Sequence, residues 1–71
     1  MVGANVDWSG CGEVEQVAGK LSGVPMLKHS PVQADAVWEN YLDGFTVEEV
    51  ADMFRLPLEQ VRAVVEYAKE R

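Results

Sequence analysis

The stretch TVEEVADMFRLPLEQVRAVVEYA, residues 46–68, decides the fold, because it encodes two short helices joined by a turn. Thr46, followed three residues later by Glu49, forms a capping box and predicts a helix over residues 47–54. Phe45 and Val50 stand at the positions of a hydrophobic staple around that cap. Apolar residues then recur at helical spacing, which predicts one buried stripe. The stripe consists of Val47, Val50, Ala51 and Phe54.

The second half of the stretch predicts a helix over residues 58–70. Pro57 suits the first turn of this helix, since its missing N–H has no partner there. Its buried side would consist of Leu58, Val61, Val64, Val65 and Ala68. Only residues 55–57 join the two helices, with Leu56 in the turn, the small Ala51 before it and the branched Val61 after it. This arrangement is typical of a helix-turn-helix unit.

A third helix and a hairpin are predicted upstream. Residues 33–43 carry apolar side chains at helical spacing, and Gly44 follows as a natural C-terminal cap. The apolar set is Ala34, Val37, Trp38, Tyr41 and Leu42. Residues 13–32 suggest two short strands with turn chemistry at Ser22-Gly23 and an edge position at Pro25. The first strand would contain Val14 and Val17, and the second Val24, Met26, Leu27 and Val32.

Residues 1–12 contain three glycines and little periodicity, so we expect a flexible N-terminal arm before a domain spanning residues 13–71. Trp8 is the exception, because a tryptophan usually packs somewhere: on its own domain, on a dimer mate, or on a partner as an anchor. The fold expected is mainly α, a three-helix homeodomain-like helix-turn-helix unit preceded by a short β-hairpin. So small a domain has a thin core, which favours a homodimer.

The composition argues against several classes of protein. One cysteine, Cys11, and one histidine, His29, cannot form a disulfide within the chain or a four-ligand zinc site. No apolar run approaches the roughly 20 residues of a membrane helix, and residues 1–12 do not resemble a signal peptide. We therefore expect a cytoplasmic protein without metal or cofactor. The chain also lacks a poised nucleophile or a phosphate-binding loop, so no enzymatic activity is expected.

The charge is unevenly distributed along the chain. The formal net charge is −6, and residues 35–54 alone carry six acidic residues and no basic one. Residues 55–71 carry four basic residues against three glutamates. Acidic groups repel nucleic-acid phosphates and attract basic protein surfaces. The middle of the chain is therefore suited to a basic protein partner, and only its last segment could approach DNA.

The sequence from Gly23 to Ala68 resembles the family called domain of unknown function 433. Members show a glycine-x-proline strand, a Gly-Thr-Arg turn, a first helix ending in glycine, and two further helices with characteristic patterns. The matching residues here are Gly23, Pro25, Asn40, Gly44, Thr46, Glu48, Glu49, Val50, Ala51, Phe54, Leu56, Glu59, Val61, Tyr67 and Ala68. Trp8, Ser9 and Cys11 resemble the start of one subgroup.

The resemblance implies a small homeodomain-like fold with an N-terminal hairpin. It also implies an antitoxin-like role in bacteria, paired with a ribonuclease-type toxin of the PIN class. The chain departs from the family pattern at His29-Ser30-Pro31, which replaces the Gly-Thr-Arg turn and removes its arginine. His29 would be either an exposed turn residue or a replacement polar contact.

The sequence is therefore consistent with two functions. The first is a non-catalytic antitoxin-like module that binds a basic protein partner. Its candidate contacts are Trp8, Trp38, Glu39, Asp43, Glu48 and Asp52, with Tyr41 as a further aromatic. The alternative is a helix-turn-helix transcriptional regulator that binds DNA, weakly when alone, through the helix at 58–70. Its candidate contacts are Arg55, Gln60, Arg62 and Lys69.

Overall fold

The computed structural model describes residues 6–16 and 23–70. Within these residues the elements are a short 3₁₀ helix η1 (Trp8–Gly10), strands β1 (Val14–Glu15) and β2 (Met26–Leu27), and helices α1 (Ala34–Leu42), α2 (Val47–Phe54) and α3 (Leu58–Lys69). The expected class, mainly α with an N-terminal β-hairpin, is confirmed.

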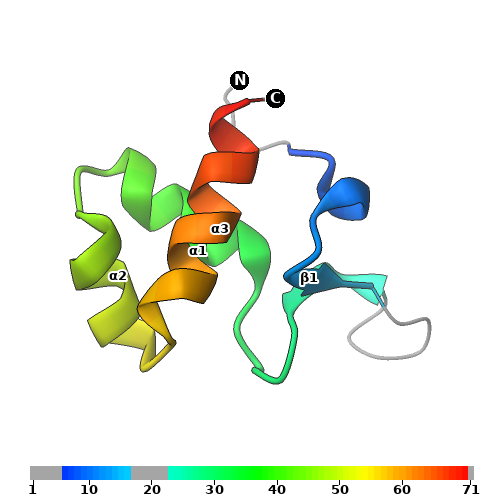
Figure 1. Ribbon diagram of the computed structural model, residues 1–71, viewed down its shortest axis with the longest axis horizontal. Coiled ribbons are helices and arrows are strands. Elements are labelled where there is room, and N and C mark those ends of the chain that lie inside the picture. Colours follow the sequence, from blue (N-terminus) through cyan, green and yellow to red (C-terminus); the bar gives the residue numbers. More distant parts are fainter. Residues whose placement is uncertain (1–5, 17–22, 71) are drawn as a thin grey trace.

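Helix α3 is the centre of the helical unit. It packs against both α1 and α2, while α1 and α2 also contact each other (Figure 1). The side chains at the centre of the core are almost completely buried, and most of them are valines. They are Leu27, Val37, Val50, Val61, Val64 and Val65. The stripe predicted for the helix at 58–70 is thus the one that the fold buries, with Leu58 partly covered.

Local sequence determines the start of α2. The Thr46 Oγ1 atom accepts a hydrogen bond from the Glu49 backbone N–H at 3.1 Å. The Glu49 carboxylate in turn accepts one from the Thr46 backbone N–H at 2.9 Å, which completes the capping box. Both predicted boundaries of this helix are confirmed.

Two helix ends use the same hydrogen-bonding pattern. At the end of α1, the Gly44 N–H donates to the Tyr41 carbonyl and the Phe45 N–H to the Asn40 carbonyl, with Gly44 at φ +110°. This is a Schellman motif, in which glycine tolerates the positive φ. At the end of α2 the pattern recurs, but Arg55 occupies the left-handed position with φ 57°.

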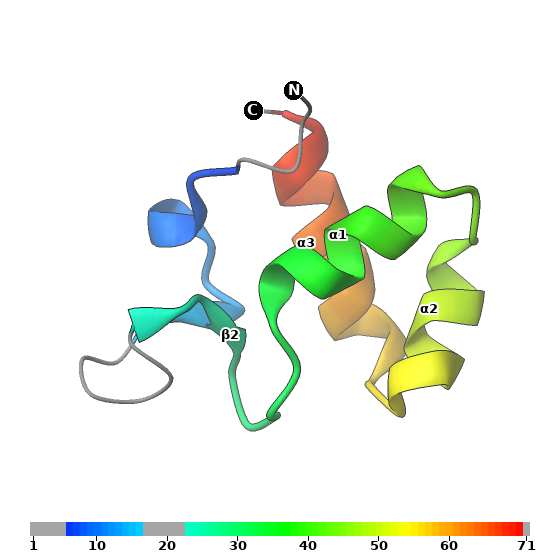
Figure 2. The same cartoon turned by 180° about the vertical axis from the view of Figure 1, so that it is seen from behind.

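The hairpin lies beside α1 and α3 and contributes to the core (Figure 2). Val14 pairs with Leu27 and Glu15 with Met26 in antiparallel register. Both Val14 and Leu27 are buried against the helices. The expected pairing is confirmed, although it is shorter than predicted: Val24 and Val32 lie outside β2, and Val17 and Ser22 lie outside the described residues.

The N-terminal segment differs from the expected flexible arm over residues 6–12. The Trp8 side chain is only 2% exposed, and its indole Nε1 donates to the Asp35 carboxylate at 2.8 Å. The ring stacks on Tyr67 of α3 with centroids 5.7 Å apart. Burying an indole releases much apolar surface from water, and this outweighs the freedom that the glycines give the backbone. Residues 1–5 of the predicted arm lie outside the described residues.

The two apolar residues on either side of the α1–α2 turn are more exposed than predicted. Leu42 was expected on the buried stripe but is 52% exposed. By helical geometry it lies roughly 90° from the centre of the side of α1 that packs on the core. Phe45, at the staple position, is 41% exposed, so the start of α2 relies on its capping box more than on a buried staple.

Candidate interaction surface

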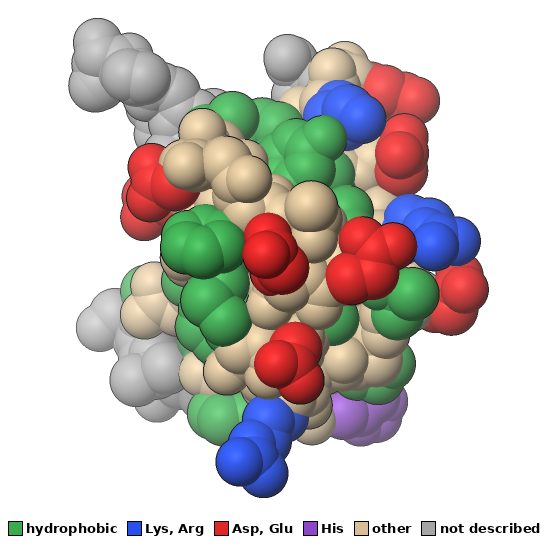
Figure 3. All heavy atoms as spheres, turned by 90° about the vertical axis from the view of Figure 1, so that its left-hand side faces the viewer, with side chains coloured by type: hydrophobic (Ala, Val, Ile, Leu, Met, Phe, Trp, Pro, Cys, Tyr) green, Lys and Arg blue, Asp and Glu red, His purple; other side chains and the backbone are tan. Residues whose placement is uncertain are grey.

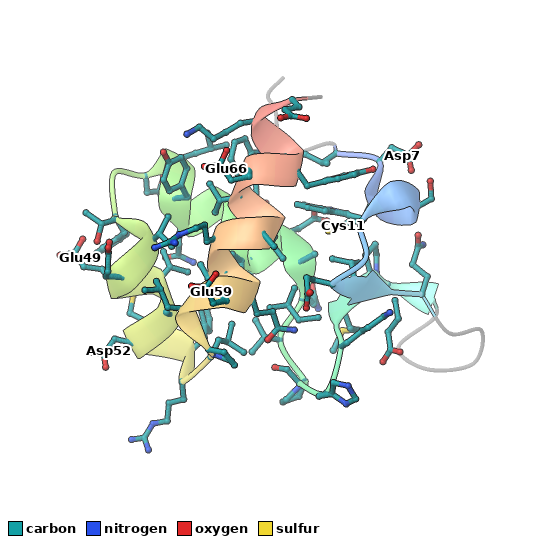
Figure 4. All side chains as sticks on the ribbon, viewed as in Figure 1. Asp7, Cys11, Glu49, Asp52, Glu59 and Glu66 are labelled. Atoms are coloured by element: carbon teal, nitrogen blue, oxygen red, sulfur yellow. The ribbon has the colours of Figure 1, made fainter. Side chains whose placement is uncertain are left out.

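The solvent-facing side of α3 is acidic. Glu59, Ala63, Glu66 and Glu70 follow one another at spacings of four, three and four residues, and all four are exposed. This spacing places them on a single stripe of the helix, opposite the buried valines. A partner that approached α3 from solvent would therefore meet carboxylates first. Figure 4 shows Glu59 and Glu66 projecting from α3.

The two basic residues of α3 are paired with these glutamates. The Arg62 guanidinium lies 3.7 Å from the Glu59 carboxylate, and the Lys69 ammonium lies 4.0 Å from that of Glu66. Lys69 also stands over the Tyr41 ring, 5.7 Å from its centroid. Exposed ion pairs of this kind add little stability, but they reduce the positive charge that either side chain presents to a ligand.

The remaining DNA-contact candidates, Arg55 and Gln60, line one hollow between the α2–α3 turn and the turn after β2. Gln60 points toward the hairpin, where its side-chain amide donates to the Lys28 carbonyl at 3.0 Å. It thus ties the turn after β2 to the start of α3. Arg55 is exposed in the turn between α2 and α3, in the left-handed conformation. Arg62 and Lys69 do not line this hollow, and Glu59 does, so the four candidates do not form one continuous basic surface.

The acidic partner-contact candidates are all accessible. Glu48 and Asp52 are exposed on α2 together with Glu49, while Glu39 and Asp43 are exposed on α1 and at its end. Figure 3 looks onto the α2 side of the molecule, where acidic groups gather over the helix and hydrophobic surface lies beside them. The outer side of α2 and the outer stripe of α3 together form what we call the acidic face. It comprises Glu48, Glu49, Asp52, Glu59, Glu66 and Glu70.

The two tryptophans named as partner contacts lie in the core. Trp8 is 2% and Trp38 8% exposed, so neither indole offers its ring to the surface. Trp38 stacks on Tyr41 at a centroid distance of 5.7 Å, and Tyr41 is half-buried. The buried Trp38 Nε1 has no hydrogen-bond partner among the described residues. Both aromatic pairs stabilise the helical unit from within.

Cys11 and His29 do not share a site. Cys11 is buried and directly follows η1 in the sequence. His29 is exposed in the turn after β2, with φ 64°. Among residues 6–16 and 23–70, no group of three His, Cys, Asp or Glu side chains is arranged to hold a metal ion. The exposed placement of His29 agrees with the simpler of its two sequence interpretations.

The sequence that forms the hairpin and the three α-helices matches a known protein family. Residues 14–68 match the sequence model of the family described as Protein of unknown function (DUF433). The chain belongs to this family. The match extends from β1 nearly to the end of α3, and it leaves η1 outside.

Several residues of the DUF433 pattern have clear structural roles in this chain. Thr46 and Glu49 cap α2, and Gly44 ends α1 with a positive φ. Tyr67 stacks on Trp8, and its hydroxyl donates to the Asp7 carbonyl and accepts from the Gly10 N–H at 3.2 Å. A Cβ on Gly10 would lie 3.1 Å from that hydroxyl, so this close approach favours glycine. The DUF433 helices are thus joined to a segment that precedes the matched residues.

No curated protein and no solved structure matches the chain. Within the described part of the chain, the longest helix has 12 residues, and none has the length and apolar character of a membrane span.

Sequence reasoning missed part of this surface. It treated Glu59, Glu66 and Glu70 only as unfavourable for DNA, and it assigned Leu42 and Phe45 to packing. The spacing of the three glutamates opposite the valine stripe was a sufficient signal for the first. No local pattern predicts that Leu42 and Phe45 are exposed, because exposure at the α1–α2 turn depends on how the helices pack.

Proposed function

We propose that this DUF433 protein is a non-catalytic, antitoxin-like interaction module that binds a basic protein partner. The observation that carries the proposal is the acidic face, six exposed carboxylates on α2 and α3. The basic side chains of these two helices and the turn between them are Arg55, Arg62 and Lys69, and the last two are paired with glutamates of the same face. The family resemblance adds the class of partner, a ribonuclease-type toxin of the PIN class.

Electrostatics favours such a partner in two ways. A surface of one sign accelerates encounter with a surface of the opposite sign, and it disfavours association with partners of like charge. Both effects weaken with added salt, because charges farther apart than about 10 Å are largely screened at 0.1 M ionic strength.

DNA binding is the second candidate, and the short α2–α3 connection with the exposed Arg55 favours it. Affinity for DNA comes mainly from basic side chains that displace counterions from phosphates. The acidic stripe of α3 opposes this contribution, as does the tie between Gln60 and the hairpin turn. We therefore propose that the free protein binds DNA weakly and without sequence preference, and that a basic partner is needed for any tighter complex.

The test is a pair of titrations at one moderate salt concentration. The protein is titrated with the purified product of the neighbouring gene and, separately, with its own upstream DNA. We expect sub-micromolar affinity for the protein partner and only weak, non-specific binding of DNA. The double variant Glu48→Gln, Asp52→Asn should bind the partner about tenfold more weakly, as loss of close charge pairs does.

Glu13→Gln is the control, since it removes a carboxylate near the hairpin rather than from the acidic face. It should leave partner affinity within about twofold, in the range of a rim charge. Sequence-specific DNA binding by the free protein at sub-micromolar concentration, with no binding of the neighbouring gene product, would reject the proposal in favour of a transcriptional regulator.

A further inference from the structure

The turn between α1 and α2 carries an exposed apolar hollow, which we call the corner hollow. Its lining residues are Tyr41, Leu42, Gly44, Phe45, Thr46 and Val47. Leu42 and Phe45 are 52% and 41% exposed, respectively. Large apolar side chains that contribute so little to the core leave much of their hydrophobic surface available for a partner.

The backbone of the corner hollow is already hydrogen-bonded within the chain. The Gly44 and Phe45 N–H groups donate to carbonyls of α1 at 3.1 and 3.3 Å, and the Thr46 N–H donates to Glu49. A ligand would therefore be held by side chains rather than by free backbone groups. Because these bonds also hold the turn in shape, little conformational freedom remains to be lost on binding.

The charges around the corner hollow are mainly negative. Asp43 lies in the sequence between the lining residues Leu42 and Gly44. The Glu49 carboxylate lies 2.9 Å from the backbone nitrogen of another lining residue, Thr46. Among the described residues, Lys69 is a cation near this corner, where it stands over the Tyr41 ring and is paired with Glu66. An apolar hollow between carboxylates is complementary to an apolar side chain between basic ones.

From these observations we propose that the corner hollow is the apolar anchor site of the partner-binding surface. It takes a leucine or aromatic side chain from a protein segment rich in lysine and arginine. The inference rests on the proposed function and specifies the chemistry of the partner segment. A second copy of this chain is a poor occupant, since a two-fold contact at this corner would bring Asp43 and Glu49 against their own symmetry mates.

The test is selection of a random displayed peptide library on the immobilised full-length protein. We expect the enriched peptides to share a large apolar residue flanked by lysine or arginine. The best of them is then synthesised, and its affinity is measured for the parent chain and for variants whose circular dichroism spectra are unchanged. Phe45→Ser should weaken binding about tenfold, as loss of an interface anchor does.

Met53→Ser is the matched control. Met53 is 45% exposed, much like Phe45, but it does not line the corner hollow. The control variant should bind the peptide within about twofold of the parent chain, as for a position outside the energetic centre of an interface. Asp43→Asn should weaken binding of the basic peptide and also reduce the dependence of that binding on salt.

Three results would overturn the inference: enriched peptides without basic residues, equal effects of Phe45→Ser and Met53→Ser, or a homodimer that Phe45→Ser dissociates. Failure of the proposed function looks different. In that case the neighbouring gene product does not bind, while basic apolar peptides still dock at the corner and lose affinity with Phe45→Ser.

Discussion

At the scale of single residues, Trp8 connects the most distant parts of the chain. Its indole hydrogen-bonds to Asp35 of α1 and stacks on Tyr67 of α3, so one side chain joins the N-terminal segment to two helices. Tyr67 in turn binds the backbone on either side of Trp8, at Asp7 and Gly10. The segment before β1 is therefore part of the folded unit, although the family match begins at residue 14.

The contribution of Trp8 can be divided by two substitutions. Trp8→Ala should lower the free energy of unfolding by about 3–5 kcal/mol, the usual cost of removing a buried aromatic ring. Trp8→Phe should cost less, about 1–2 kcal/mol, because it keeps a stacking ring and loses the bond to Asp35. Urea denaturation measures both, with exposed Met53→Ala as a control near zero. Equal values for Trp8→Ala and the control would mean that the segment is not docked.

At the scale of the secondary-structure elements, the α1–α2 and α2–α3 turns have the same backbone conformation but place different residues at the left-handed position. Each ends a helix with the same pair of backbone hydrogen bonds, and each requires a left-handed residue. Gly44 adopts this conformation without strain, whereas Arg55 has a Cβ that makes it unfavourable. The α2–α3 turn therefore keeps an exposed cation at a cost in stability.

Arg55→Gly should relieve that strain. We expect the free energy of unfolding to rise by about 0.5–1 kcal/mol, the strain released minus the extra freedom of glycine in the unfolded chain. The matched control is Arg62→Gly, which places the same substitution inside α3 and should cost about 1 kcal/mol. Thermal or urea unfolding distinguishes a rise in the free energy of unfolding from a fall. A loss of stability in Arg55→Gly would show that the arginine side chain makes a stabilising contact that outweighs the strain.

At the scale of the whole molecule, the described part of the chain is compact, and one side of its hairpin is covered by the segment that leads into α1. The radius of gyration is 11.2 Å, close to the value of about 11 Å for a compact chain of this length. The helices are therefore well packed. The outer side of β2 is covered, because Met26 is bridged to Gln33 and the Leu27 N–H donates to the Val32 carbonyl at 2.9 Å. Among the described residues, the outer edge of the sheet is therefore that of β1. Exposed strand edges favour pairing with another chain.

We accordingly expect a homodimer that pairs through the hairpin, on the side of the molecule away from α2. Sedimentation velocity at tens of micromolar, the range in which weak dimers appear, should show a species of twice the monomer mass. Phe45→Ser should leave that species unchanged, because the corner hollow lies at the other end of the helical unit (Figure 1). A stable monomer at these concentrations would contradict the predicted homodimer.

The sequence by itself determined the helical unit, because its signals are local. The capping box of Thr46 and Glu49 and the valine spacing of α3 need only residues within a few positions of each other, and both were confirmed. The tertiary structure alone decided the rest. Trp8 is bonded to Asp35, which lies 27 positions further along the chain, and the side chain of Gln60 is bonded to the carbonyl of Lys28, 32 positions away. Leu42 and Phe45 remain exposed. Such outcomes depend on which surfaces the packed helices bring together, and no local pattern of residues encodes that.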